Sequence, residues 1–158
     1  MKTLLAYATK YGFAERCAGM LAEQLAGQVD LYNLQNRREL NLVDYDKIII
    51  GGSVYMGKIR KEVSQFCADN LPGLLEKKVG LFICGMREEE AEQEIRDNFP
   101  AELHDKAAAR GFFGGEFIFD RMNFMEKIIV KKVAKTSQDI SEAREKNIAE
   151  FARIMNEA

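Results

Sequence analysis

The sequence predicts an α/β fold in which helices cover both faces of a parallel sheet, a three-layer sandwich. Short, nearly continuous apolar runs alternate along the chain with longer segments of helical period, which is typical of that class. The 158 residues are 47% hydrophobic and 30% charged, values that suit one domain over 1–158 with one core. No apolar run reaches the roughly 20 residues that a membrane-spanning helix needs. A net charge of −2 argues against nucleic-acid binding by bulk electrostatics.

The first half of the chain contains three expected strands and two expected helices. The third strand is the most clearly predicted, because Ile48–Ile50 are both apolar and β-branched. Pro72 and Gly73 are expected to end the second helix. A parallel pair needs a crossover, so residues 33–45 must connect the second and third strands without a full helix. In order, the expected elements are a strand over 3–8, a helix over 14–25, a strand over 29–34, a strand over 47–52 and a helix over 59–71.

The second half adds two strands and three helices. A further dry run is followed by a glycine-bearing turn and then by a very acidic helical segment. This alternation completes a five-stranded parallel sheet with right-handed crossovers. In order, the expected elements are a strand over 78–84, a helix over 87–98, a strand over 111–119 and helices over 122–135 and 140–155.

The residues that most often carry catalysis or bind metals are sparse. Cys17, Cys67 and Cys84 have no metal-ligand or disulfide spacing, which indicates three reduced thiols in a cytoplasmic protein. The apolar run Leu4–Ala8 is too short for a secretion signal. His104, the only histidine, lies in a polar stretch and is expected at the surface without a catalytic role. We therefore expect no metal and no catalytic side-chain set.

Three glycine-bearing loops follow three of the dry strands, over Thr9–Phe13, Gly52–Lys58 and Cys84–Arg87. The carboxyl ends of parallel strands share one edge of a sheet, so these loops can meet around one crevice. The first loop enters a helix N-terminus, whose free N–H groups and dipole favour a phosphate. Taken alone, this loop is also consistent with a plain strand-to-helix turn, because it lacks the dinucleotide and Walker fingerprints.

Two of these loops resemble those of a known family. Thr9-Lys10-Tyr11-Gly12-Phe13-Ala14 resembles the phosphate loop of flavodoxins, and Ser53-Val54-Tyr55-Met56-Gly57-Lys58 resembles their first flavin loop. The resemblance implies the sheet order 2-1-3-4-5 and FMN as the cofactor. The residues it implies for FMN binding are Thr9, Lys10, Tyr11, Gly12, Phe13, Ala14, Ser53, Val54, Tyr55, Met56, Gly57, Lys58, Cys84, Gly85 and Met86.

Within the second loop the resemblance implies separate roles. The Gly57 carbonyl would turn toward the flavin when the ring gains a proton, and Lys58 would raise the flavin potential as a nearby cation. Tyr55 and Met56 would cover the ring, or else pack as ordinary loop residues. Ala14 stands where the family has a threonine hydroxyl.

A narrower resemblance points to an enzyme. The segments 1–5, 11–12 and 51–58 are similar to flavodoxin-like protoporphyrinogen dehydrogenases that pass electrons to menaquinone. Residues 120–129 resemble the basic segment of that family. The resemblance implies a quinone and a porphyrinogen as partners, with the protein cytoplasmic and peripheral at the inner membrane face. Met122–Lys135 would make that contact through apolar and basic stripes, or would cover its own sheet instead.

The alternative function is a flavodoxin-type electron carrier between protein partners, without substrate turnover of its own. The acidic segment 87–105 favours it, because an acidic rim near the flavin loops can steer a basic redox partner. The same acids are also consistent with a solvated helix. A third alternative, a relative that has lost FMN, rests on Ala14 alone. The sequence predicts no particular oligomeric state.

Overall fold

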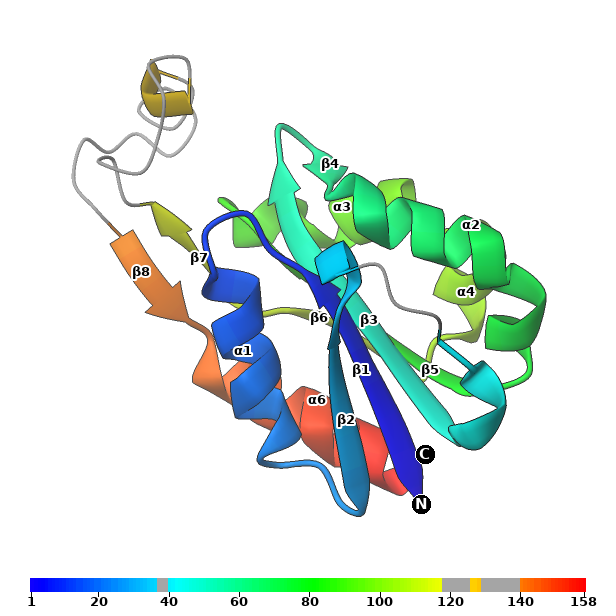
Figure 1. Ribbon diagram of the computed structural model, residues 1–158. Helices are drawn as coiled ribbons and strands as arrows, with labels where there is room; N and C mark the ends of the chain where they lie inside the picture. The colour runs from blue at the N-terminus through cyan, green and yellow to red at the C-terminus, as the bar shows by residue number, and fades with distance from the viewer. Residues whose placement is uncertain (37–39, 118–125, 129–139) are drawn as a thin grey trace.

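The computed structural model describes residues 1–36, 40–117, 126–128 and 140–158, and it is a three-layer α/β sandwich (Figure 1). Five strands form the parallel sheet in the order β2-β1-β3-β5-β6. This is the predicted order 2-1-3-4-5, since the short β4 pairs antiparallel with β3 outside that path. The bounds are β1 Lys2–Ala8, β2 Gln28–Asn33, β3 Lys47–Tyr55, β4 Lys58–Ile59, β5 Lys78–Cys84 and β6 Ala109–Phe112.

Helices cover the two faces of the sheet in two separate apolar clusters (Figure 1). On one face lie α1 and α6, and on the other lie α2, α3 and α4. In α6 the buried residues recur at helical spacing, as Ile148, Phe151, Ala152 and Met155, which gives that helix one apolar stripe. The bounds are α1 Phe13–Ala22, α2 Lys61–Leu75, α3 Ala91–Asn98, α4 Ala101–Lys106 and α6 Glu145–Glu157.

Two strand glycines let aromatic rings lie against the sheet. A Cβ at Gly51 would lie 2.3 Å from the Phe82 ring, which itself stacks on Phe113 with ring centroids 4.6 Å apart. A Cβ at Gly80 would lie 2.7 Å from the Phe151 ring. These glycines are therefore required by packing, because a protein interior has no spare volume for a methyl group.

In the crossover from β2 to β3, the described residues form two short 3₁₀ turns, η1 Leu34–Asn36 and η2 Leu42–Asp44. The Asn41 side chain caps η2 by accepting a hydrogen bond from the Val43 amide at 3.1 Å. The Tyr45 hydroxyl then donates to Asp30 of β2 at 2.7 Å. The expected connection without a full helix is therefore confirmed.

Two predicted helix boundaries are wrong. The second helix begins at Lys61 rather than 59 and runs through Pro72 to Leu75. Leu74 is fully buried against the sheet, and this burial offsets the backbone hydrogen bond that proline cannot make. Ile59, expected in the helix, belongs to β4. The acidic segment forms a 3₁₀ turn, η3 Glu88–Glu90, followed by α3.

The expected strand over 111–119 is also wrong as a single element. It divides into β6 and β7 Gly114–Phe117, and β7 pairs antiparallel with β8 Ile140–Ala143. Gly114 has φ +101° and lies against the backbone of Glu142, so the chain turns out of the parallel sheet there. Residues 140–143 are therefore a strand and not the start of the last helix. The expected helix over 122–135 lies outside the described residues, apart from 126–128.

The expectation that His104 lies at the surface is likewise wrong. The sequence pattern did not indicate α4, which packs on the sheet and leaves His104 only 9% exposed. Its Nδ1 lies 3.3 Å from the Asp105 carboxylate. All three cysteines are buried and free. Among the residues that the structure describes, no helix is long and apolar enough to cross a membrane.

Candidate functional site

The three glycine-bearing loops converge at the carboxyl ends of β1, β3 and β5. They border one hollow with about 600 Å³ of atom-free space, part of it open solvent, which we call the main hollow. It lies where the strand order reverses between β1 and β3, as expected for a ligand site in such a sheet. Its lining residues are Lys10, Tyr11, Phe13, Ser53, Val54, Tyr55, Arg60, Cys84, Gly85, Met86, Gly115, Glu116 and Glu126.

The first loop is shaped by a threonine and a glycine. The Thr9 hydroxyl oxygen accepts a hydrogen bond from the Gly12 amide at 2.9 Å, a contact that does not use the hydroxyl proton. Gly12 has φ +94° and precedes α1, a conformation that L side chains rarely adopt. The first intrahelical bond runs from the Arg16 amide to the Gly12 carbonyl, so the amides of Phe13 and Ala14 have no partner within the helix. They supply the positive end of the α1 dipole.

Lys10 and Tyr11 already hold an anionic oxygen. The Lys10 ammonium lies 2.7 Å from Glu126 Oε2, and the Tyr11 hydroxyl donates to the same oxygen at 2.6 Å. The Lys10 ammonium also lies 4.1 Å from the centroid of the Tyr55 ring. The Glu126 side chain is only 8% exposed. The cluster Lys10–Tyr11–Tyr55–Glu126 is therefore a partly buried anion site occupied by a side chain of the same protein.

Burial and the Glu126 charge keep both phenols protonated at neutral pH. Burial, followed by the hydrogen bond to Glu126, raises the pKa of Tyr11 to about 12. Burial and the same carboxylate raise the pKa of Tyr55. Tyr11 is thus a hydrogen-bond donor throughout the physiological pH range.

The second loop is a tight hairpin rather than an open loop. β3 continues to Tyr55, and a two-residue turn follows, in which Met56 has φ +52° and Gly57 φ +77°. Two positive φ angles define a type I′ turn, which matches the twist of paired strands. Met56 and Gly57 border a second hollow beside α3, which shares Val54 and Met86 with the main hollow. Lys58 is exposed and, in the described part of the chain, borders neither hollow.

Besides Lys10, a second cation borders the main hollow in the described part of the chain, Arg60, which sequence reasoning missed. Its Nε is buried without a hydrogen-bond partner among the described residues and lies 3.7 Å from Glu62. Arg60 caps the N-terminus of α2, where the helix dipole disfavours a cation. An arginine at a helix N-terminus is unfavourable for the helix, so it could have indicated a functional role for Arg60 if the start of α2 had been predicted correctly.

The third loop closes the main hollow from β5. The Gly85 amide donates to the Gly114 carbonyl at 2.9 Å, which ties this loop to the start of β7. Burial raises the pKa of the Cys84 thiol well above its usual value, and the neighbouring Cys17 raises it further. Cys84 is therefore a packing residue and not a thiolate nucleophile.

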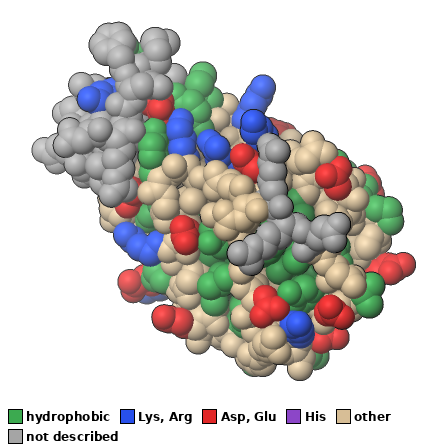
Figure 2. Space-filling model, in the orientation of Figure 1, with side chains coloured by type: hydrophobic (Ala, Val, Ile, Leu, Met, Phe, Trp, Pro, Cys, Tyr) green, Lys and Arg blue, Asp and Glu red, His purple; other side chains and the backbone are tan. Residues whose placement is uncertain are grey.

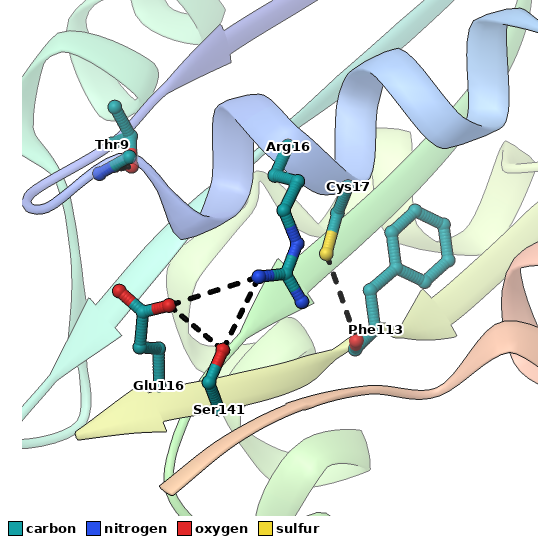
Figure 3. Close-up of polar contacts among 7 residues, drawn as sticks. Thr9, Arg16, Cys17, Phe113, Glu116 and Ser141 are labelled. Atoms are coloured by element: carbon teal, nitrogen blue, oxygen red, sulfur yellow. Dashed lines mark hydrogen bonds and ion pairs between the residues drawn. The ribbon is translucent and has the colours of Figure 1, made fainter. Parts of the chain in front are cut away.

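Contacts behind the first loop fix α1 to the β7–β8 hairpin (Figure 3). Arg16 bonds the Ser141 hydroxyl at 3.2 Å and lies 3.9 Å from Glu116, while Ser141 donates to Glu116 at 2.8 Å. Figure 2 shows Lys and Arg side chains gathered at the upper end of the molecule, where the parallel strands end. This end of the molecule therefore suits an anionic ligand.

Of the residues predicted to bind FMN, nine border the main hollow: Lys10, Tyr11, Phe13, Ser53, Val54, Tyr55, Cys84, Gly85 and Met86. Thr9, Gly12 and Ala14 shape the first loop without bordering it. Ala14 is fully buried and packs in the core under α1, which explains a small apolar residue at that position. Glu126 could not have been predicted, because it lies far along the chain from the loop it contacts.

A parallel sheet with its site at the switch point, beside a helix N-terminus, defines an α/β protein that binds a phosphate-bearing ligand. The family model of the flavodoxin domain matches residues 4–143, and the chain therefore belongs to this family. No curated protein matches the sequence.

Solved structures with the same fold are distant in sequence. A short-chain flavodoxin associated with a bacterial microcompartment is 17% identical, with a TM-score of 0.61 over 99% of this chain and 97% of that one. The oxidised flavodoxin 2 of Bacillus cereus is 20% identical, with a TM-score of 0.57 over 99% of both chains. The FMN-bound flavodoxin of Fusobacterium nucleatum is 12% identical, with a TM-score of 0.55 over 99% of this chain and 97% of that one.

Proposed function

We propose that this chain is an FMN-binding redox protein, with one FMN-binding domain over 1–158. The observation that carries the proposal is the convergence of three loops on one hollow beside the N-terminus of α1. The flavodoxin of Fusobacterium nucleatum, which shares the fold, binds FMN. We propose fourteen of the fifteen residues predicted from the sequence, all except Lys58, together with Arg60, as those that bind or shape the cofactor site.

The residues present fit a ligand with an anionic end and an aromatic ring. Lys10 and Tyr11 hold a carboxylate oxygen, and a phosphate oxygen has the same charge and hydrogen-bonding chemistry. Arg60 brings a buried N–H that makes no hydrogen bond within the described residues, although it lies 3.7 Å from Glu62. Val54, Tyr55 and Met86 give the hollow apolar walls, and its apolar lining suits a flavin ring.

The protein contributes binding, orientation and electrostatics. FMN supplies the electron-transfer chemistry once it is bound. The first loop and Lys10 would hold the phosphate, which would fix the position of the whole ligand. Tyr55 would cover the ring, and Arg60 places positive charge beside the hollow. We assign no side chain to acid–base catalysis.

Within this class we propose oxidation of a porphyrinogen with a quinone as acceptor, as the resemblance of the sequence implies. The favouring observation is the connection between β7 and β8. Antiparallel neighbours need only about two to five connecting residues, whereas here residues 118–139 intervene and Glu126 reaches the main hollow. A further wall at the hollow, which Glu126 contributes, suits an enzyme that must bind a substrate better than a bare carrier. The membrane contact through 122–135 and the cytoplasmic location stay predictions.

The second candidate is an electron carrier that meets its redox partners through the acidic η3–α3 edge. Glu89 and Glu92 there have exposed side chains, at 64% and 86%. This edge lies next to the second hollow, which Arg87, Glu90 and Glu94 border. An exposed acidic edge beside the cofactor loops favours association with a basic protein surface.

Purification and titration test the cofactor. We expect a yellow protein that releases FMN on denaturation, and apoprotein that quenches FMN fluorescence on titration. Lys10→Met removes a charge-assisted bond and should weaken FMN binding about 10- to 100-fold. Lys58→Met is the matched control and should change it less than twofold. A colourless protein that quenches no FMN would refute the proposal.

Anaerobic turnover separates the enzyme from the carrier. Purified holoprotein is mixed with protoporphyrinogen and a menaquinone analogue, and porphyrin fluorescence is followed. An enzyme produces porphyrin over many turnovers in proportion to its concentration. Formation of one porphyrin removes six electrons, which reduce three quinones in the enzyme reaction, whereas one FMN accepts two. A carrier without turnover therefore yields at most about one third of an equivalent of porphyrin per FMN, and that result would leave electron shuttling as the function.

A further inference from the structure

The tip of the β3–β4 hairpin depends on a side chain from another element. Val54–Ile59 and Tyr55–Lys58 pair across this hairpin, and at its base the Arg60 amide donates to the Ser53 carbonyl at 3.1 Å. A ladder of two residue pairs is not stable by itself in water. Met56, at the turn, is 62% exposed, so packing of its side chain adds little.

Asn98, at the C-terminal end of α3, supplies the missing contacts. Its Nδ2 donates to the Gly57 carbonyl at 2.9 Å, and its Oδ1 accepts from the Ile59 amide at 3.0 Å. The second Nδ2 proton bonds the Glu94 carbonyl at 2.7 Å. In an extended strand the carbonyl of one residue and the amide two residues later point to the same side. The Asn98 carboxamide therefore bonds the free edge of β4 as a residue of a neighbouring strand would.

We propose that Asn98 is a positioning residue that holds the Gly57 carbonyl on the α3 side of the hairpin. This oxygen must leave Asn98 before it can accept a hydrogen bond from a ligand in the main hollow. The proposal rests on the proposed FMN function. It is supported by the position of Gly57, which borders the second hollow with Glu90 and Glu94 and not the main one.

The turn is open on the side where a Gly57 side chain would lie, and glycine has no Cβ to restrict rotation of the peptide groups beside it. No heavy atom lies within 4 Å of the position that a Cβ on Gly57 would take. Gly57 also carries the positive φ of this turn at little steric cost. Reduced FMN has more N–H donors than oxidised FMN, so a carbonyl freed from Asn98 favours the reduced cofactor. Asn98 thus opposes reduction of the bound flavin through the conformation of the hairpin.

The apoprotein provides the first test, which needs no cofactor. Asn98→Ala removes both contacts to β4, whereas Asn98→Asp keeps the acceptor for Ile59 and loses the donor to Gly57. Asn70→Ala is the matched control, because Asn70 makes the same bond to a helix carbonyl, Phe66, at 2.9 Å in α2. Amide exchange at Ile59 and the carbonyl ¹³C shift of Gly57 are measured by NMR.

We expect Asn98→Ala to speed Ile59 exchange and to move the Gly57 shift. Asn98→Asp should move only the Gly57 shift, and the control should change neither. Unchanged Ile59 exchange in Asn98→Ala would overturn the proposal.

The second test measures Kd for oxidised and for reduced FMN under anaerobic conditions. In Asn98→Ala the Kd for oxidised FMN divided by the Kd for reduced FMN should rise about two- to fivefold, which corresponds to the net free energy of one hydrogen bond. An unchanged ratio, with faster Ile59 exchange, would also overturn the proposal. Failure of wild-type protein to bind FMN would refute the proposed function instead, and the exchange data would still decide whether Asn98 holds the hairpin.

Discussion

Glu126→Gln should tighten FMN binding, although it removes a buried ion pair. Glu126 holds the two groups that we assign to the cofactor phosphate, with 2.7 Å to Lys10 and 2.6 Å to Tyr11. A phosphate that binds Lys10 must first displace this carboxylate. Glutamine keeps the shape and one acceptor oxygen but not the charge, so it competes less strongly.

The expected gain in FMN affinity follows from the contacts that Glu126 makes with Lys10 and Tyr11. A charge-assisted hydrogen bond is about twice as strong as a neutral one, a difference of about 1 kcal/mol for a partly buried bond. The Lys10 side chain is 26% exposed, so we discount its share and expect about 1–2 kcal/mol in total. This corresponds to FMN binding about 5- to 30-fold tighter. The free energy of unfolding of the apoprotein should fall by a similar amount, because the same contacts stabilise it.

Fluorescence titration with FMN and with riboflavin measures the effect. Riboflavin lacks the phosphate, so its Kd should change much less than that of FMN. Glu142→Gln removes an exposed pair with Arg144 and is the matched control, with an expected change in FMN affinity of less than twofold. Unchanged or weaker FMN binding by Glu126→Gln, or equal gains for both ligands, would refute the competition between Glu126 and the phosphate.

Three further predictions concern packing, pH and charge. Gly51→Ala should lower the free energy of unfolding by about 1–3 kcal/mol, because the new methyl group clashes with the buried Phe82 ring. Gly19→Ala in α1 is the control, because its methyl group meets no atom, and it should raise the free energy of unfolding by up to about 1 kcal/mol. Urea denaturation measures both. Burial, followed by the hydrogen bond to Asp30, raises the pKa of Tyr45 to about 12. The neutral hydroxyl therefore stabilises the fold fully below pH 10, and this contribution disappears between pH 10 and 12. Over that range the free energy of unfolding should fall by about 1–2 kcal/mol less in Tyr45→Phe than in wild type, and equal decreases would contradict the raised pKa. Arg60→Gln should make the two-electron FMN potential about 20 mV more negative in a redox titration, equivalent to about 1 kcal/mol, while Lys58→Gln should leave it unchanged.

The order of the sheet could be predicted because its strands are continuously apolar and its helices are amphipathic. Residues 47–52 and 79–84 are buried on both faces in a parallel sheet, and that burial produces nearly continuous apolar runs. The strand over 111–119 failed because β7 leaves the sheet at Gly114, and a single glycine does not distinguish a bend from a strand interior. The start of the last helix failed for a related reason, because β8 exists only as the partner of β7.

The loops of the site were predicted, but their charges were misassigned. Strand ends fix where the loops lie, and this part of the prediction depends on topology alone. Lys58 lies in β4, whereas Arg60 is the N-cap residue of α2. Two residues at this spacing in one strand would share a face, so the difference between them depends on where β4 ends and α2 begins. Lys58 was expected near the ligand, whereas Arg60 borders the hollow.

The phosphate loop of this chain combines a buried alanine with a lysine and a tyrosine. Ala14 is fully buried in the core, so a hydroxyl on its Cβ would need a partner inside that core or would be left unpaired. The polar contacts come instead from Lys10 and Tyr11, whose longer side chains reach the hollow from the outer part of the loop. Because one of these groups is a full charge, it needs a counter-ion when no phosphate is bound. Glu126 provides that counter-ion, so the same contact that stabilises the free protein sets the cost of binding the cofactor.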